Sequence, residues 1–436
     1  MQTTQTVAVS RRRYLSIAIW SVLVVYSIAH FLYSGVIAAW TSPGGDFLSA
    51  FPGPLALRMG QTWPALSRDW IEGALGMGPL KWNYGPVLHI VTLPFALAAT
   101  EGQAMRAILL VDYALIAATM AIWFHLLRRG REGFHGNGPD PLFPVLCLWL
   151  NYFPLLEAVT GREIEIAELF LVTVGIWALR RERETVAGVA FGVAAMTKFL
   201  PAIYLPYLFV KGFRRAGLTA AGTALSIALL AQPLLGWQRS ATLLIARSEV
   251  AGTDFRTSYA NQALPNILYK MFTGFDASNP HPPTWYPNVL RPIAYAASFG
   301  LLVATSWFVY RWRRGRLIEL ECALLAIVMC LVSSHANTYY FVFALPALSL
   351  GIAAIQRDAS RVGLPSRLAL GGAVVLSGFL VPMKVFEVLT GTRGVVVARV
   401  LQAWSLPAFG VILAAGLMVE LHRVSRGELR PYSTIR

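Results

Sequence analysis

Long apolar runs alternate with short clusters of lysine and arginine along this chain, and no other feature constrains its fold as strongly. The first run, residues 14–40, exceeds the roughly 20 residues that an α-helix needs to cross a bilayer. Basic clusters separate the runs, at residues 11–13, 128–131, 180–183, 211–215, 311–316, 357–361 and 422–430. Because cytoplasmic loops of membrane proteins concentrate Lys and Arg, the pattern predicts an all-α polytopic membrane protein.

The composition excludes several other classes. Apolar residues make up 56% of the 436 residues and charged residues only 14%, against roughly 25% charged in soluble domains. The formal charge of +15 lies in clusters between apolar runs, so it indicates membrane topology and not a nucleic-acid partner. Cys147, Cys322 and Cys330 all lie within apolar runs, which argues against a disulfide framework or structural zinc.

Placing every basic cluster in the cytoplasm requires an even number of crossings between consecutive clusters. We therefore expect one integral domain over residues 1–436, with about twelve helices, in the cytoplasmic (inner) membrane. Both termini, including the tail 421–436, are predicted to lie on the cytoplasmic side. Residues 41–103 and 237–292 become external loops. The run 84–99 would rise only about 24 Å and is predicted to lie along the outer surface.

A short hairpin, residues 185–211, lies between two cytoplasmic clusters. Each arm would rise roughly 20 Å, less than the roughly 30 Å hydrocarbon thickness, so its apex with Lys198 should be buried. An ammonium at that depth is costly unless it faces water or an anion, although snorkelling to the interface is an alternative.

Two further polar residues fall on the same external side. Asp46 follows the first span directly after two glycines, where a carboxylate sits at the outer surface or caps a helix. His335 lies in a short external turn, where an ordinary interfacial histidine is the alternative to a functional one.

Several motifs, in this order, resemble the GT-C superfamily of membrane glycosyltransferases, and particularly the polyprenyl-phosphate-mannose-dependent mannosyltransferases of glycosyltransferase family 87. The motifs are Gly45-Asp46-Phe47, Trp82-Asn83-Tyr84-Gly85-Pro86, Ala187-Gly188-Val189-Ala190-Phe191-Gly192 before Thr197-Lys198-Phe199-Leu200-Pro201, Ser258-Tyr259-Ala260-Asn261-Gln262-Ala263-Leu264, and Ser334-His335 before Tyr339-Tyr340. The resemblance implies a GT-C fold whose large first external loop carries juxtamembrane helices. It also implies an extracytoplasmic active site.

The expected reaction assigns roles to these residues. A leaving phosphate needs charge stabilisation, for which Lys198 is the candidate. The acceptor hydroxyl needs a carboxylate base, for which Asp46 is the candidate, and a single displacement would invert the anomeric centre. The remaining substrate-binding candidates are Tyr84, Arg162, Glu165, Asn261, Gln262 and His335.

The turn 161–165 departs from the family, because it reads Gly-Arg-Glu-Ile-Glu where a Gly-Gln and Asn pattern is usual. Arg162 and Glu165 could therefore bind a different sugar or form a structural ion network. The external loops lack an Asp-x-Asp pair, so no metal cofactor is indicated, although Glu163 and Glu165 leave one open.

The expected partners are membrane lipids, a polyprenyl-phosphate sugar and a glycolipid or glycan acceptor. The main alternative is a secondary transporter or lipid flippase, but the external loops are too unequal for two matching halves. A non-catalytic assembly subunit, and an enzyme using lipid pyrophosphate donors, also stay open.

The topology predicts how single cysteines will react with a membrane-impermeant thiol reagent. In a background without the three native cysteines, cysteines at positions Ser49 and Ser278 should label from outside and one at Ser360 from inside. Labelling of position 278 from the cytoplasm alone would contradict the topology.

Overall fold

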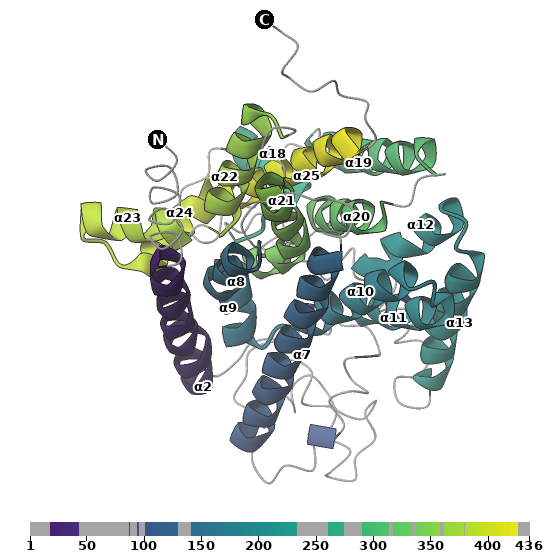
Figure 1. Ribbon diagram of the computed structural model, residues 1–436, viewed down its shortest axis with the longest axis horizontal. Helices are drawn as coiled ribbons and strands as arrows, with labels where there is room; N and C mark the ends of the chain where they lie inside the picture. Colours follow the sequence, from purple (N-terminus) through teal and green to yellow (C-terminus); the bar gives the residue numbers. More distant parts are fainter. Residues whose placement is uncertain are drawn as a thin grey trace, which may run out of the picture.

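The computed structural model describes residues 18–42, 87, 94–95, 101–129, 141–232, 260–273, 290–313, 317–333, 336–357, 362–378 and 380–425. Within these ranges the chain forms helices joined by short turns, and no strand occurs among them (Figure 1). This confirms the all-α prediction. Most of the run 84–99 and most of both large predicted loops lie outside the described residues.

The helices follow the predicted apolar runs. The first, Ala18–Thr41, includes the π-helical segment η1 (Leu32–Ile37) and ends with α2 (Ala38–Thr41). The others are α7 (Glu101–Arg129), α8 (Leu142–Asn151), α9 (Phe153–Gly161), α10 (Glu165–Arg180), α11 (Glu184–Lys198), η4 (Leu200–Ile203), α12 (Tyr204–Val210), α13 (Arg214–Leu230), α18 (Leu264–Thr273), α19 (Leu290–Arg311), α20 (Ile318–Val332), η5 (Thr338–Ala344), α21 (Leu345–Arg357), α22 (Leu364–Gly378), α23 (Leu380–Thr390), α24 (Gly394–Ala403) and α25 (Leu406–Ser425).

Five helical segments in the described residues are long and apolar enough to cross a membrane, or up to seven if two bent helix pairs each count as one span. The chain is therefore a polytopic membrane protein. Several other helices are shorter: α10 has 16 residues and α20 has 15, which corresponds to about 24 Å or less. The count of about twelve helices stays a prediction.

Two breaks differ from the continuous spans expected from the sequence. The apolar run 141–157 bends by 47° between α8 and α9, where Pro154 lies in the first turn of α9. The apolar run 397–420 is divided between two helices, α24 and α25. Ser405 adopts a left-handed φ of 56°, and α25 begins at the next residue, with Pro407, whose ring nitrogen carries no N–H, in its first turn.

Helix α20 lies at the centre of the bundle. Its residues from Glu321 to Leu331 are all buried, and it contacts α10, α18, α19, α21, α25, η4 and η5. A helix that is apolar on every side requires neighbours on every side, so α20 acts as the core around which the other helices pack.

The glycine-rich hairpin packs tightly for a steric reason. A Cβ added at Gly188 would lie 2.5 Å from the carbonyl oxygen of Ala216, and one at Gly192 would lie 2.6 Å from that of Ala220. Small residues at these positions allow the α11 and α13 backbones to approach closely.

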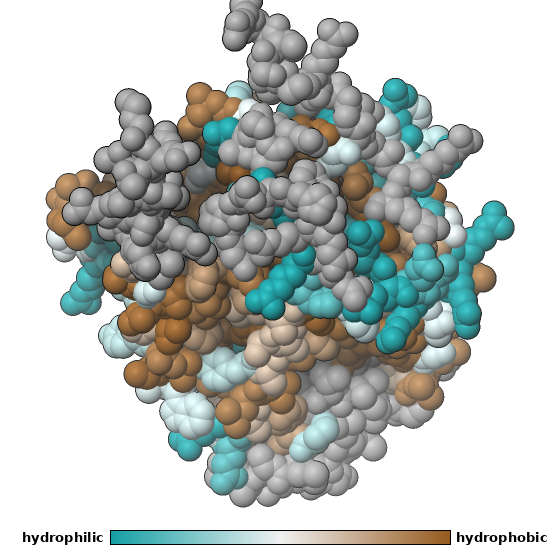
Figure 2. All heavy atoms as spheres, in the orientation of Figure 1, coloured by the Kyte–Doolittle hydropathy of each residue, from teal (hydrophilic) through white to brown (hydrophobic). Residues whose placement is uncertain are grey.

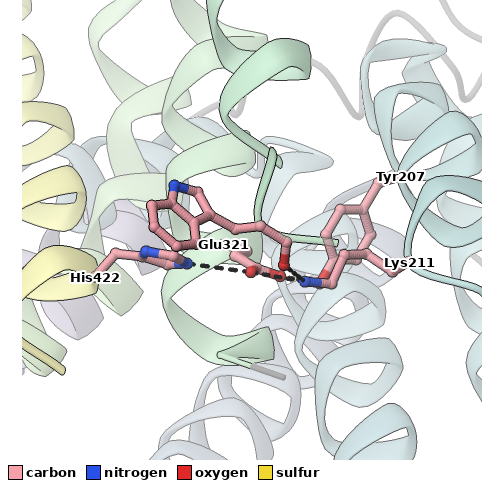
Figure 3. Close-up of polar contacts among 5 residues, drawn as sticks. Tyr207, Lys211, Glu321 and His422 are labelled. Atoms are coloured by element: carbon pink, nitrogen blue, oxygen red, sulfur yellow. Dashed lines mark hydrogen bonds and ion pairs between the residues drawn. The ribbon is translucent and has the colours of Figure 1, made fainter. Parts of the chain in front are cut away.

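Three of the predicted cytoplasmic clusters meet around Glu321 (Figure 3). The Lys211 ammonium donates to Glu321 Oε1 at 2.8 Å and to the carbonyl oxygen of Trp312 at 3.0 Å. The Tyr207 hydroxyl donates to Glu321 Oε2 at 3.0 Å, and His422 Nε2 lies 3.3 Å from Oε1. Residues from separate clusters thus lie at one end of the bundle, as the parity argument requires. We call these five residues the Glu321 network.

The outer surface of the bundle suits contact with lipid. On α19, Phe299 and Trp307 are 68% and 63% exposed, respectively. Figure 2 shows hydrophobic side chains over much of one face, with hydrophilic side chains gathered toward the right. An apolar surface of this extent is typical of helices that face a bilayer.

Removing Glu321 should destabilise the protein strongly. In Glu321→Ala the Lys211 ammonium stays buried without its carboxylate, and loss of one partner of a buried pair typically costs about 3–5 kcal/mol. Glu319→Ala is the matched control on the same helix, because Glu319 pairs with Arg180, whose side chain is 51% exposed, and should cost less than about 1 kcal/mol. Thermal unfolding of the detergent-solubilised protein measures both, and equal losses would contradict the prediction.

Candidate functional site

The turn before α10 and the apex of the α11–α12 hairpin meet in a buried ion pair. Lys198, the last residue of α11, donates from Nζ to Oε1 of Glu165, the first residue of α10, at 2.6 Å. Their side chains are 2% and 0% exposed. Phe199 follows with a left-handed φ of 62°, which ends α11 and fixes the lysine at the apex.

Two adjacent aromatic rings lie against the same ammonium. Lys198 Nζ is 4.8 Å from the centre of the Tyr340 ring and 5.7 Å from that of Tyr339. Both tyrosines belong to η5, which follows the predicted histidine turn. Cation–π attraction adds to the ion pair, so Lys198 does not snorkel to the surface.

The buried Lys198 ammonium could exchange its anionic partner, the Glu165 carboxylate, for another anion. Lys198 is buried with one carboxylate at hydrogen-bonding distance, and Glu168 is buried one turn beyond Glu165. An ammonium in such surroundings favours anionic oxygens strongly, because few water molecules compete for it. The arrangement can hold an anion that displaces or joins Glu165.

The predicted Asn-Gln motif docks onto the segment that follows His335. Asn261 Oδ1 accepts from the backbone N–H groups of Ala263 and Ala336, at 3.0 and 3.1 Å. The Gln262 N–H donates to the Ala336 carbonyl at 2.6 Å, and its side-chain amide donates to the Gln402 carbonyl at 2.9 Å. The motif therefore positions the backbone beside His335.

One chain segment links the Asn261–Gln262 turn to the Lys198–Glu165 pair. The segment from Ala336 to Tyr340 connects them: its first residue bonds Asn261 and Gln262, and its last lies on Lys198. Three of the predicted residues, Lys198, Asn261 and Gln262, thus contact one segment, and Glu165 is connected to it through Lys198.

Arg162 lies on a different set of partners. Its Nη2 donates to the Ala39 carbonyl at 2.8 Å, its Nη1 to that of Ser42 at 3.0 Å and its Nε to that of Met105 at 3.3 Å. The last carbonyls of a helix lack hydrogen-bond donors within it. At the end of the first span, the Arg162 guanidinium donates to two of these carbonyls. Burial lowers the pKa of Arg162, and the Asp112 carboxylate opposes that shift.

Three of the predicted site residues, Asp46, Tyr84 and His335, lie outside the described residues. Residues near two of them in the sequence are described. Arg162 holds the carbonyl of Ser42, four residues before Asp46. Ala336, directly after His335, is held by Asn261.

Lys270 is a buried cation that the sequence reasoning did not single out. Its Nζ donates to the carbonyls of Asn261 and Gln402, at 2.9 and 3.0 Å, and lies 3.4 Å from Ser405 Oγ. Burial lowers the pKa of Lys270 to about 7. The available signal was a lone lysine in the short apolar helix α18, which directly follows the Asn-Gln motif.

Among the described residues, no group of three or more His, Cys, Asp and Glu side chains is arranged to hold a metal ion. Glu163 and Glu165, the acids for which a metal was left open, are both buried. That the reaction needs no metal cofactor stays a prediction.

Comparison with known proteins gives the family. The profile of glycosyltransferase family 87 matches residues 82–334, more than half of the chain. The chain belongs to glycosyltransferase family 87. No curated protein matches it significantly. The family 87 match includes Tyr84, Arg162, Glu165, Lys198, Asn261 and Gln262, whereas Asp46 precedes it and His335 follows it directly. The resemblance inferred from the motifs is confirmed, and the protein is a membrane glycosyltransferase.

A double-mutant cycle on the buried pair should show coupling. Lys198→Met and Glu165→Gln should each destabilise the protein, because each leaves one buried partner without its counter-charge. The double variant should lose less than the sum of the single losses, by about 1 to 3 kcal/mol. Chemical unfolding in detergent provides the four free energies, and strictly additive losses would show that the two residues do not interact.

Proposed function

We propose that this family 87 enzyme transfers a sugar, mannose or another hexose or pentose, from a polyprenyl-phosphate donor to a lipid-linked or glycan acceptor. The reaction takes place at the outer face of the cytoplasmic membrane and inverts the anomeric centre. The observation that supports this most is the buried Lys198–Glu165 pair beneath Tyr340, which is joined to the Asn261–Gln262 turn within the family match.

The donor chemistry calls for a fixed positive charge and not for a general acid. A phosphate ester leaves as a stable anion, and its developing charge is best stabilised by a preorganised cation in a site that excludes water. Lys198 meets this requirement because it is buried and held by Glu165. On donor binding, the phosphate oxygens compete with the Glu165 carboxylate for the ammonium.

The acceptor chemistry calls for a base. A sugar hydroxyl must lose its proton as the new bond forms, and a positioned carboxylate accepts it. Asp46 takes this role, and attack opposite the phosphate in a single displacement inverts the configuration. Arg162 contributes by holding the carbonyl of Ser42, which precedes Asp46 by four residues in the sequence.

The other predicted residues position the two substrates. Asn261 and Gln262 fix the turn beside His335, and hydroxyl and amide groups of this kind suit a sugar. Tyr84 offers a ring for stacking on a sugar face. Glu165 keeps Lys198 in place before the donor arrives. No metal cofactor enters this proposal.

Asp46→Asn should abolish transfer while membrane insertion and thermal stability stay as in the parent. The amide has nearly the shape of the carboxylate but accepts no proton at neutral pH, and loss of a general base costs about 10² to 10⁴ in rate. The measurement is transfer by purified protein from radiolabelled polyprenyl-phosphate sugars to crude membrane lipid.

Asp69→Asn makes the same change elsewhere in the first predicted external loop and serves as the control that should keep activity. Asp46→Glu should recover little, because the added methylene displaces the base by roughly an ångström. If Asp46→Asn kept activity within about threefold of the parent, a helix-capping role would replace the base role, since Asn caps as well as Asp.

A further inference from the structure

The backbone of Gln402, near the end of α24, connects three segments at the candidate site. Its carbonyl oxygen accepts from the side-chain amide of Gln262 at 2.9 Å, from Lys270 Nζ at 3.0 Å and from the backbone N–H of Ser405 at 2.9 Å. The last carbonyls of a helix lack donors within the helix, and this one receives them from the Asn-Gln turn, from α18 and from the residue before α25. The backbone of Gln402 is therefore held independently of its side chain.

The side-chain amide of Gln402 is anchored at one end. Its Nε2 donates to Thr338 Oγ1 at 2.5 Å, and Thr338, the first residue of η5, is fully buried. A threonine hydroxyl can both donate and accept a hydrogen bond, so it can hold either end of an amide group. The contact fixes the direction in which the rest of the amide points.

The other end of the same amide is open. Gln402 Oε1 has no hydrogen-bond partner among the described residues, yet it keeps some accessible surface, although the whole residue is only 6% exposed. A polar atom in such surroundings is satisfied by water or by a ligand. An anchored amide with one open end is a preformed hydrogen-bonding site for a small polar group.

The anchor of this amide lies on the segment that contacts Lys198. Tyr340 follows Thr338 by two residues, and its ring centre is 4.8 Å from Lys198 Nζ. Two residues of a 3₁₀ helix rise about 4 Å, so Thr338 holds Gln402 less than one helical turn from the ring that covers the proposed phosphate-binding cation. The sugar of a polyprenyl-phosphate donor is bonded directly to that phosphate, so its hydroxyl groups lie at a comparable distance.

We propose that Gln402 binds a ring hydroxyl of the transferred sugar, and that Thr338 is a positioning residue that orients its amide. The inference rests on the proposed function, because it assigns recognition of the donor's sugar to this residue. A sugar hydroxyl suits the site because it both donates and accepts, and so complements either end of an amide. Both residues lie beyond the family 87 match, which ends at residue 334, so membership of the family gives them no role.

The alternative role for Gln402 is a clamp that only holds α24 against η5. A clamp stabilises the fold to the same extent whichever donor is present. A residue that binds a hydroxyl instead distinguishes a donor that carries this hydroxyl from one that lacks it, because the analogue leaves the amide without a partner. The two roles therefore differ in substrate discrimination.

The test compares one donor with its deoxy analogues. The polyprenyl-phosphate sugar that the full chain uses best, from a panel of hexoses and pentoses, is prepared with each ring hydroxyl removed in turn, and kcat/KM is measured for each in nanodiscs. Gln402→Met removes the amide at similar volume and keeps the backbone contacts. Thr338→Val removes the anchor, and Thr338→Ser keeps it.

Two matched controls make the same changes outside the candidate site. Gln356→Met lies near the end of α21. Thr119→Val lies on α7, where the native hydroxyl donates to the Leu115 carbonyl at 2.6 Å. Thermal unfolding of every variant separates a loss of folded protein from a loss of recognition.

The parent should lose at least about tenfold in kcat/KM with one of the deoxy donors. Gln402→Met should use the intact donor about tenfold less well than the parent and should use this deoxy donor within about twofold of the intact one. Thr338→Val should lose most of the discrimination and raise the KM for the donor more than it lowers kcat. Thr338→Ser should restore discrimination, and both controls should match the parent.

Equal use of every deoxy donor by the parent would overturn the proposal, as would parental discrimination in Gln402→Met. If Gln402→Met does not fold, Thr338→Val and Thr338→Ser decide by the same ratio. A higher requirement for acceptor membrane lipid, with an unchanged KM for the donor, would also overturn it, because the amide would then bind the acceptor. Absence of transfer from every polyprenyl-phosphate donor would refute the proposed function, whereas transfer with unchanged discrimination would refute the role of Gln402 alone.

Discussion

Charge that is buried in an apolar bundle must find its partner inside the bundle, and this requirement determines which helices of the protein are neighbours. Apolar contacts between helices in a membrane have little directional preference, because lipid tails are as apolar as leucine. Polar contacts between helices determine which helices pack together. Lys198 joins α11 to α10, Lys211 joins the end of α12 to α20, and Arg162 joins the first span to the turn before α10. Removing Lys198 or Lys211 leaves a buried carboxylate without its counter-charge, and removing Arg162 takes a donor from three backbone carbonyls.

Helix α20 connects the two ends of the molecule through these contacts. Near one end Glu321 gathers Lys211, Tyr207 and His422. Beyond the other end the chain continues through Ala336 into η5, which rests on Lys198. The apolar middle of α20 lines an apolar pocket together with α19 and α25. The central helix therefore fixes the separation between the candidate site and the Glu321 network. Charge stabilisation in catalysis requires preorganised groups of this kind.

Much of this arrangement could be predicted from sequence. Apolar runs and basic clusters predict the helices and their sidedness, and the short hairpin predicts that Lys198 is buried. Parity places Lys198 and Glu165 on one face, but their pairing depends on the packing of α10 against α11, which no local pattern encodes. Lys270 was missed because a single lysine in a short helix resembles a surface residue until its neighbours are known. The break at Ser405 depends on one left-handed residue, a conformation that serine adopts only in context.

The turn 161–165, where this chain departs from the usual family pattern, gains a physical meaning from the structure. Arg162 is engaged by three backbone carbonyls and Glu165 by Lys198, so the two residues act on different partners. Arg162 fixes the end of the first span at Ser42, four residues before the proposed base in the sequence. Glu165 neutralises Lys198, the proposed phosphate-binding cation. An uncharged ligand cannot replace the Glu165 carboxylate as the counter-charge of Lys198, whereas a phosphate can. Under the proposed function, the buried pair would therefore favour anionic over neutral lipids by electrostatics, before any contact with the sugar is made.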